Sequence, residues 1–172
     1  PHISADLHLD ASHKGYLLSA FFWSSAILQI PLGRWADRSN LKWLTAGTFA
    51  FWSLACALTY YASTFRALLI LRVALGIGES VFVPCASRIV NLLFAAHERG
   101  FPLGIYTAGA RLGLAFSSPL IAYLVGAYGW HRMFLLVGTG SLVWLLPWLS
   151  FFPGWLGRLS RRAAGPTEAR EQ

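Results

Sequence analysis

The sequence predicts an all-α membrane protein, a bundle of about five helices that cross a lipid bilayer. Composition is the first reason, because 56% of the 172 residues are hydrophobic and only 12% are charged. A typical soluble domain is about 25% charged. Segment length is the second reason: the apolar residues form long runs, and one helical crossing needs about 20 residues. A membrane β-barrel would instead show alternating segments of about ten residues. The chain length suits one bundle rather than two domains.

Apolar segments separated by short polar stretches give the expected helices in order. The five segments are 15–33, 41–62, 67–94, 101–127 and 132–152. Each is long and continuous, so length rather than periodicity identifies it as a helix. The charged stretches 34–42 and 95–100 are tight connections, and short connections make neighbouring helices antiparallel.

Basic side chains indicate which side of the membrane each connection occupies, because cytoplasmic loops carry an excess of Lys and Arg. One side carries Arg34, Arg38, Lys42, Arg88, Arg99, Arg158, Arg161, Arg162 and Arg170, and the other carries Lys14, Arg66 and Arg132. We therefore expect residues 1–14 outside the cell and 153–172 as a flexible basic tail in the cytoplasm. An odd number of crossings that begins outside predicts one further helix before Pro1.

The net charge of +7 does not indicate a nucleic-acid-binding protein. Basic residues flank the apolar segments, whereas a nucleic-acid interface gathers them on one face. The polar start of the chain carries histidines and carboxylates, but a metal site requires a tighter spacing, so we expect a solvated loop and no metal or cofactor. These residues are His2, Asp6, His8, Asp10 and His13.

Both cysteines, Cys56 and Cys85, lie within apolar segments. This placement favours buried, inert thiols over a disulfide framework, which needs more cysteines and a loop-rich chain. No nucleophile accompanied by a base lies where water and substrate would meet, so the sequence does not indicate an enzyme.

The stretch 71–80, LRVALGIGES, places Arg72 and Glu79 inside an apolar segment. Seven residues are two helical turns, about 10.5 Å, so the two side chains lie on nearly the same face, with Gly76 between them. Each charge costs about 2.5–3.5 kcal/mol at the centre of a membrane helix. They therefore face a partner helix or an aqueous cavity.

Two interpretations of Arg72 and Glu79 remain open at this point. In the first, the two charges interact by roughly 1.7 kcal/mol at about 10 Å and an effective dielectric constant near 20. An anion bound at Arg72 then raises the proton affinity of Glu79, which predicts proton-coupled anion transport. In the second, each charge pairs with a neighbouring helix and only fixes packing, or Arg72 lies shallow and snorkels to the surface.

Arg111 raises the same question in the stretch TAGARLGLAF. It lies ten residues into the fourth segment, about 15 Å from the membrane face and therefore near the midplane. Gly109 and Gly113 flank it and form a small-residue face that suits close helix packing. Arg111 is therefore either a second anion contact or a packing residue.

The loop GRWADRSNLK, residues 33–42, resembles the G-x-x-x-D-R-x-G-R-(R/K) loop of the major facilitator superfamily. Gly33, Asp37, Arg38 and Lys42 match it, whereas Asn40 replaces the second glycine and Leu41 an arginine. The resemblance implies that the loop latches the two halves of a transporter on the cytoplasmic side. A simple basic loop that sets topology is the alternative.

Other stretches resemble the anion:cation symporter group of that superfamily, which carries sugar acids and other organic anions. PHISADL is similar to the end of its first helix and GYLLSAFFWSSAILQIPLG to its second. LRVALGIGES with VFVP is similar to its fourth, HERG and GIYTAGARLGLAFSSPL to its fifth, and GWHRMFLLVGTG to the start of its sixth. The resemblance implies that residues 1–152 are most of an N-terminal six-helix half, and that substrate binds between it and a C-terminal half.

By this resemblance Arg72 faces the substrate anion and Glu79 carries the coupled proton. Trp23 and Ser25 lie in the matching stretch of the second helix, where relatives that carry sugar acids often have Tyr in place of Ser25. Ala110 stands where such relatives have Gln, next to Arg111. Both departures remove groups that recognise hydroxyls, which predicts a more anionic or less hydroxylated substrate.

The sequence therefore predicts a secondary active transporter in the bacterial inner membrane. It would carry a small organic anion together with a proton by alternating access, and sodium stays open as the driving ion. The rival interpretation is a membrane protein that keeps this fold without transporting, either a solute sensor or a structural subunit.

Overall fold

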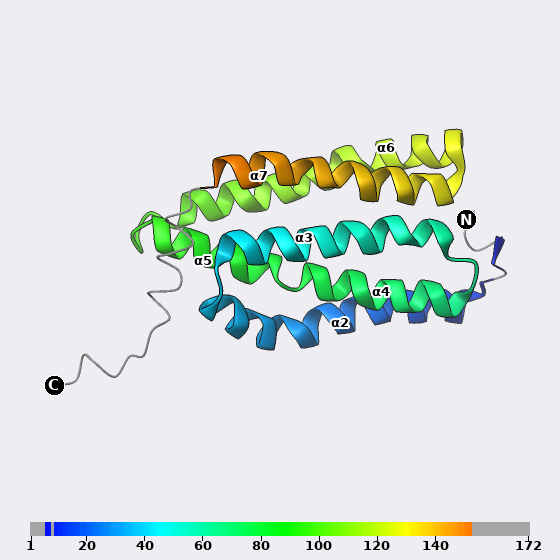
Figure 1. Cartoon of the computed structure of the whole chain (residues 1–172), viewed down its shortest axis with the longest axis horizontal. Helices are drawn as coiled ribbons and strands as arrows, with labels where there is room; N and C mark the ends of the chain where they lie inside the picture. The colour runs from blue at the N-terminus through cyan, green and yellow to red at the C-terminus, as the bar shows by residue number, and fades with distance from the viewer. Residues whose placement is uncertain (1–5, 8, 153–172) are drawn as a thin grey trace.

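The computed structural model describes residues 6, 7 and 9–152, and within them it contains helices and no strands. The helices lie roughly side by side as a bundle (Figure 1). In chain order they are α2 (Ala11–Arg38), α3 (Leu41–Leu58), the 3₁₀ turn η1 (Thr59–Tyr61), α4 (Phe65–Glu79), α5 (Phe82–Leu93), α6 (Gly100–Ser141), the 3₁₀ turn η2 (Leu142–Trp144) and α7 (Leu145–Phe151).

Four helical stretches in the described residues are long and apolar enough to cross a membrane. The last, Gly100–Phe151, has 52 residues and would be about 78 Å long if straight, more than twice the thickness of a bilayer. Gly129 divides it, with φ 79° and ψ 163°, a conformation that glycine adopts without a steric penalty. The chain reverses there, and its second part returns along the first (Figure 1). The all-α bundle predicted from the sequence is thus confirmed.

Side-chain caps explain where three of the helices begin. Asp10, Asn40 and Thr64 are the N-caps of α2, α3 and α4, and each side chain accepts a hydrogen bond from a backbone N–H in the first turn. Such caps satisfy donors that a helix leaves free at its start. Asp10 therefore extends α2 four residues before the apolar segment that was predicted to begin at residue 15.

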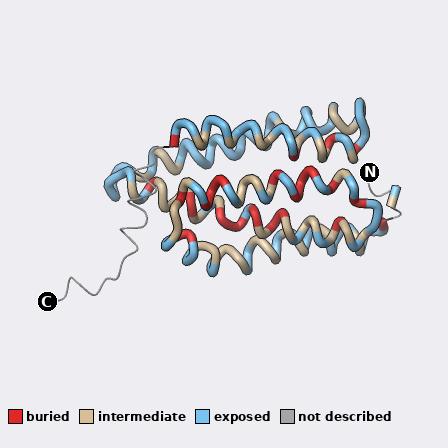
Figure 2. The backbone as a smooth tube through the Cα atoms, in the orientation of Figure 1, coloured by how far each residue is buried: buried red, intermediate tan, exposed pale blue. Residues whose placement is uncertain are grey.

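Helix α4 packs closely against α2, and α6 packs closely against α3; the buried residues of Figure 2 concentrate on α3 and α4. A Cβ on Gly76 of α4 would lie 2.6 Å from the carbonyl oxygen of Phe21 on α2. A Cβ on Gly138 of α6 would lie 2.7 Å from the carbonyl oxygen of Ser53 on α3. Glycine thus lets these backbones touch, which is how helices in lipid associate closely.

The two cysteines are free and buried, as predicted. Cys56 packs with Ala55 and Leu75 where α3 meets α4. Cys85 belongs to a separate cluster with Leu41 and Val81, at the end of the bundle where α2 joins α3.

The first part of α6 is the least buried segment of the described bundle. Every residue from 104 to 116 is exposed, and Figure 2 shows this helix almost entirely in pale blue. An extra Cβ on Gly109 or Gly113 would meet nothing within 4 Å. The first part of α6 is therefore loosely packed against the other described helices.

Candidate functional site

The predicted third segment, 67–94, is interrupted in its middle, directly after Glu79. Helix α4 ends at Glu79 and α5 begins at Phe82, with Ser80 and Val81 in a turn between them. Pro84 explains the break, because proline has no N–H to donate to the carbonyl of Ser80, and its ring crowds that carbonyl. Discontinuous helices of this kind line binding sites in many transporters. The sequence carries a signal for this break, since Pro84 follows Glu79 by five residues.

Arg72 and Glu79 lie two turns apart on α4, as the spacing predicts. Arg72 is half-buried and close enough to Cys56 of α3 for an electrostatic interaction. Glu79 is exposed at the helix break. Among residues 6, 7 and 9–152, neither side chain forms a hydrogen bond or an ion pair. The described helices therefore supply no neutralising partner for either charge.

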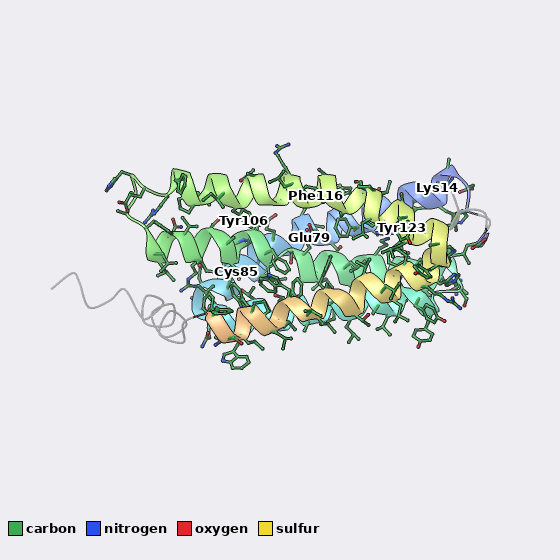
Figure 3. The ribbon with its side chains drawn as sticks, turned by 90° about the horizontal axis from the view of Figure 1, so that it is seen from above. Lys14, Glu79, Cys85, Tyr106, Phe116 and Tyr123 are labelled. Atoms are coloured by element: carbon green, nitrogen blue, oxygen red, sulfur yellow. The ribbon has the colours of Figure 1, made fainter. Side chains whose placement is uncertain are left out.

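Glu79 lines a cavity of about 270 Å³ between α3, the α4–α5 break and α6. Figure 3 shows Glu79 and Tyr106 in the space between α6 and the α4–α5 stretch. Aromatic rings dominate this cavity, which is lined by Phe49, Trp52, Glu79, Phe82, Val83 and Tyr106. Sequence reasoning did not identify Tyr106, because nothing in the sequence relates it to a residue 27 positions earlier.

The two predicted contacts on α2, Ser25 and Trp23, differ in how closely they approach the face of α4 that carries Arg72 and Glu79. The backbone nitrogen of Ser25 would be 3.1 Å from a Cβ on Gly76, so α2 crosses α4 between Arg72 and Glu79. Ser25 therefore lies near the two charges. Trp23 is 66% exposed and is not part of this close contact.

Arg111 is exposed on α6 and has no hydrogen bond or ion pair among the described residues. It follows Tyr106 by five positions, which is about 140° around a helix. Its side chain therefore leaves the helix on a different side from the one that lines the Glu79 cavity. In the described bundle Ser25 lies against α4 between Arg72 and Glu79, whereas Arg111 lies on a different side of α6 from the Glu79 cavity.

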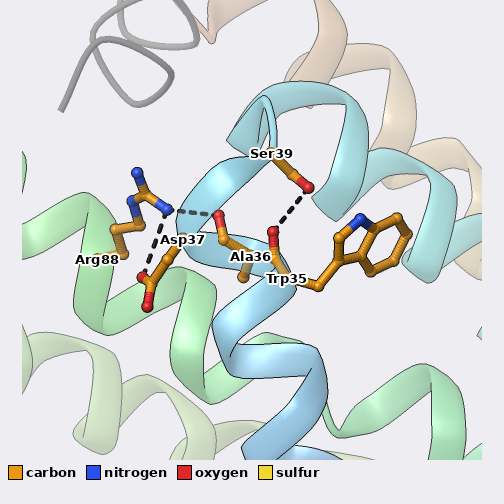
Figure 4. Close-up of polar contacts among 5 residues, drawn as sticks. All are labelled: Trp35, Ala36, Asp37, Ser39 and Arg88. Atoms are coloured by element: carbon orange, nitrogen blue, oxygen red, sulfur yellow. Dashed lines mark hydrogen bonds and ion pairs between the residues drawn. The ribbon is translucent and has the colours of Figure 1, made fainter. Parts of the chain in front are cut away.

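The loop expected to act as a latch is tied to α5 within the bundle. Nη1 of Arg88 donates to Oδ1 of Asp37 at 3.4 Å and to the carbonyl of Ala36 at 2.5 Å (Figure 4). The hydroxyl of Ser39 donates to the carbonyl of Trp35 at 2.7 Å. A Cβ on Gly33 would be in ordinary contact with Pro84, at 3.6 Å.

Lys42, the last residue of the loop, binds backbone carbonyls at the far end of the described chain, which its position in the sequence does not predict. Its Nζ donates to the carbonyls of Leu149 at 2.7 Å and of Phe152 at 3.2 Å. Nε1 of Trp148 donates back to the Lys42 carbonyl at 3.1 Å. Lys42 therefore joins the start of α3 to the end of α7, whereas Arg38 is exposed.

The histidine-rich start of the chain lies only partly within the described residues. Asp10 Oδ1 accepts a hydrogen bond of 2.7 Å from the backbone of His13, and the imidazole of His13 meets the ring of Phe65 edge-on, at 4.6 Å between centroids. Residues 6, 7 and 9–152 contain no group of three residues able to hold a metal ion. His2, His8 and the predicted tail 153–172 lie outside the described residues.

Comparison with known proteins identifies relatives over most of the chain. It is 31% identical over 150 residues to a probable L-galactonate transporter of Escherichia coli (strain K12), covering 87% of this chain and 33% of the relative. It is 32% identical to a D-galactonate transporter of Escherichia coli O6:H1, covering 88% and 35%. It is 37% identical to a probable sulfoacetate transporter of Cupriavidus necator, also covering 88% and 35%. The chain thus spans about a third of the length of these relatives.

The family itself follows from a second comparison. The sequence model of the Major Facilitator Superfamily matches residues 1–172. The apolar helices of the bundle agree with that match and with a position in the membrane. The chain is therefore part of an integral, multi-pass membrane protein and belongs to the major facilitator superfamily.

Proposed function

We propose that the full-length protein is a secondary active transporter that moves a small organic anion together with a proton by alternating access. The observation that carries this proposal is the pair of charges on α4. Arg72 and Glu79 lie two turns apart on α4, and neither forms a hydrogen bond or an ion pair with the described residues. Intramembrane charges are costly, so they persist where substrate or ion pathways need them.

Arg72 holds the carboxylate of the solute. A guanidinium group binds a carboxylate through two parallel N–H···O bonds, which fixes the orientation of the anion as well as its charge. Before the anion arrives, the positive charge of Arg72 favours the ionised form of Glu79 by roughly 1.7 kcal/mol. Anion binding cancels this effect and raises the proton affinity of Glu79. Proton and anion therefore load together.

The solute is a small organic acid, and its class follows from the relatives and from two positions. The relatives are named as transporters of galactonate and of sulfoacetate. Ser25 and Ala110 are smaller than the groups that sugar-acid relatives were expected to carry there. Ser25 and Trp23 contact the solute on the α2 side, and Arg111 reaches it only once further helices complete the site. An anion with few hydroxyl groups suits these side chains best.

The cytoplasmic latch is formed by Gly33, Asp37 and Arg38. Lys42 stabilises the end of the bundle that carries this latch, through its bonds to the end of α7. The positive charges put this end in the cytoplasm of a bacterium and residues 1–14 outside the inner membrane. A second half of the protein closes on this end when the site faces outward. Such rocking around a central site is the usual mechanism of transporters built from two halves.

Uptake by proteoliposomes that contain the full-length protein tests this proposal. An inward gradient of sulfoacetate or galactonate should drive proton entry, and an inward proton gradient should drive accumulation of the anion. Glu79→Gln should abolish proton-driven accumulation and leave exchange of the anion intact. Arg72→Gln should abolish both, whereas Arg66→Gln, an exposed control at the start of α4, should change neither.

Three results would contradict the proposal. Accumulation that survives Glu79→Gln unchanged would exclude this carboxylate as the proton carrier. Accumulation that is driven by a sodium gradient and not by a proton gradient would show that sodium is the coupling ion in place of the proton. Binding of the anion without any flux would favour a sensor of this fold.

A further inference from the structure

The cavity beside Glu79 contains a second polar group that the proposed function has not used. Its lining residues are mainly apolar and aromatic, and the side chains with polar atoms are Glu79, Tyr106 and Trp52. Glu79 enters from the end of α4, Trp52 from α3 and Tyr106 from α6. A carboxylate in such an aromatic cavity has few donors near it, so each one strongly affects its proton affinity.

The hydroxyl of Tyr106 forms no hydrogen bond with any described residue. Tyr106 is 43% exposed and lies on the part of α6 in which residues 104–116 are all exposed. A phenol can donate one hydrogen bond and accept others. Tyr106 and Glu79 line the same cavity, and because α6 is loosely packed here, the helix has room to move toward α4.

Few other charged or titratable groups surround Glu79. On its own helix, Arg72 lies two turns away, about 10.5 Å along the axis. From α3, Cys56 lies beside Arg72 rather than beside Glu79. From α2, the close contact consists of Phe21, Ser24 and Ser25, which carry no charge.

Apart from Tyr106 and the indole N–H of Trp52 on α3, no side-chain donor lines the described cavity. On α5, Cys85 packs into a different cluster with Val81 and Leu41, and Phe82 and Val83 line the cavity with apolar side chains. On α6, Arg111 lies about 140° around the helix from Tyr106. Tyr106 is thus the phenol positioned to respond to the charge of Glu79.

We propose that Tyr106 is a positioning residue for proton coupling: its hydroxyl donates a hydrogen bond to the ionised carboxylate of Glu79 when α6 closes on α4. The bond stabilises the charged form, so closure favours release of the proton. The proton passes from Glu79 to water at the open side of the cavity, and Tyr106 keeps its own proton throughout. This inference rests on the proposed role of Glu79.

Infrared difference spectroscopy on the full-length protein tests the inference without requiring transport. The titration of the Glu79 carboxyl group is isolated by subtracting the spectra of Glu79→Gln from those of the parent protein. In Tyr106→Phe the midpoint of this titration should move up by about one pH unit, because a hydrogen bond to a charged group is lost. Tyr123→Phe is the matched control, since Tyr123 lies farther along α6 (Figure 3), is 66% exposed and does not line the cavity.

Transport gives a second, independent readout. The pH at which anion exchange is half-maximal should move in Tyr106→Phe and stay in place in Tyr123→Phe. Added to Glu79→Gln, Tyr106→Phe should have no further effect on exchange, because the group it acts on is gone. A Tyr106→Phe protein whose carboxyl titration coincides with that of the parent overturns the inference.

The two proposals fail in different ways. If Glu79→Gln abolishes proton-driven accumulation and Tyr106→Phe shifts nothing, the transport mechanism stands and the role of Tyr106 is wrong. If Glu79→Gln leaves accumulation unchanged, the proposed function fails first. An equal shift in Tyr106→Phe and Tyr123→Phe would also contradict a specific bond to Tyr106.

Discussion

The ammonium group of Lys42 donates a hydrogen bond of 2.7 Å to the carbonyl oxygen of Leu149, 107 positions later in the chain. A second bond to the carbonyl of Phe152 accompanies it. Helix α7 ends at Phe151, and the last carbonyls of a helix have no partner within it. A positive charge there also complements the helix dipole. Lys42 therefore caps the end of α7 from the first turn of α3.

Replacing Lys42 by Met should weaken the contact between these two helices. We expect the free energy of unfolding to fall by about 1.5–3 kcal/mol, since bonds from a charged donor are lost. Thermal unfolding of the purified protein in detergent measures the change. Lys14→Met, which removes an exposed lysine at the start of α2, should have little effect. Equal losses in both variants would show that the bonds to α7 contribute nothing of their own.

Gly138→Ala should be destabilising although Ala favours helices. A Cβ at this position would lie 2.7 Å from both the Ala57 Cα and the Ser53 carbonyl oxygen, and both are backbone atoms that cannot rotate away. Overpacking of this kind costs about 1–3 kcal/mol. Gly140→Ala, two residues later with nothing within 4 Å, should be neutral or stabilising by up to about 1 kcal/mol. The thermal midpoints of the two variants should therefore move in opposite directions, or only that of Gly138→Ala should fall.

Arg88 should matter more for stability than its partner Asp37. The side chain of Arg88 is only 11% exposed and that of Asp37 is 70% exposed. Removing Arg88 by Arg88→Met breaks its bond to the Ala36 carbonyl as well as the ion pair, which should cost about 1.5–3 kcal/mol. Asp37→Asn changes an exposed contact and should cost at most about 1 kcal/mol. Thermal unfolding of the two single variants and of the double variant measures these losses. A larger loss in Asp37→Asn than in Arg88→Met would contradict the prediction.

The start of α2 should be weakened by acid. The backbone N–H of His13 holds the pKa of Asp10 below its ordinary value of 3.8. Because the folded pKa is the lower one, the charged cap stabilises the folded state above pH 3.8, and this contribution is lost as the pH falls through the folded pKa. Asp10→Asn keeps a side-chain oxygen without the charge. The difference in thermal midpoint between the parent and this variant should shrink on acidification, and a constant difference would contradict this account of the cap.

Some features of the bundle follow from the sequence because they depend on local physics. The apolar segments identify the crossings, since a bilayer demands about 20 apolar residues whatever the neighbouring helices are. The relation of Arg72 to Glu79 follows from helix geometry, since seven residues always complete nearly two turns. Loop residues such as Asp10 and Asn40 set helix starts through caps that reach only two or three residues.

Only the tertiary structure decided which helices and side chains meet. In lipid a helix is apolar on all sides, so its sequence does not indicate which face packs against which neighbour. The bond from Trp130 to Asp6 and that from Lys42 to Leu149 join residues more than a hundred positions apart. Tyr106 likewise meets the Glu79 cavity only because α6 lies beside the break after α4. The sequence by itself determined the helices and the placing of Arg72 and Glu79 on one face of α4, and packing decided what surrounds these two charges.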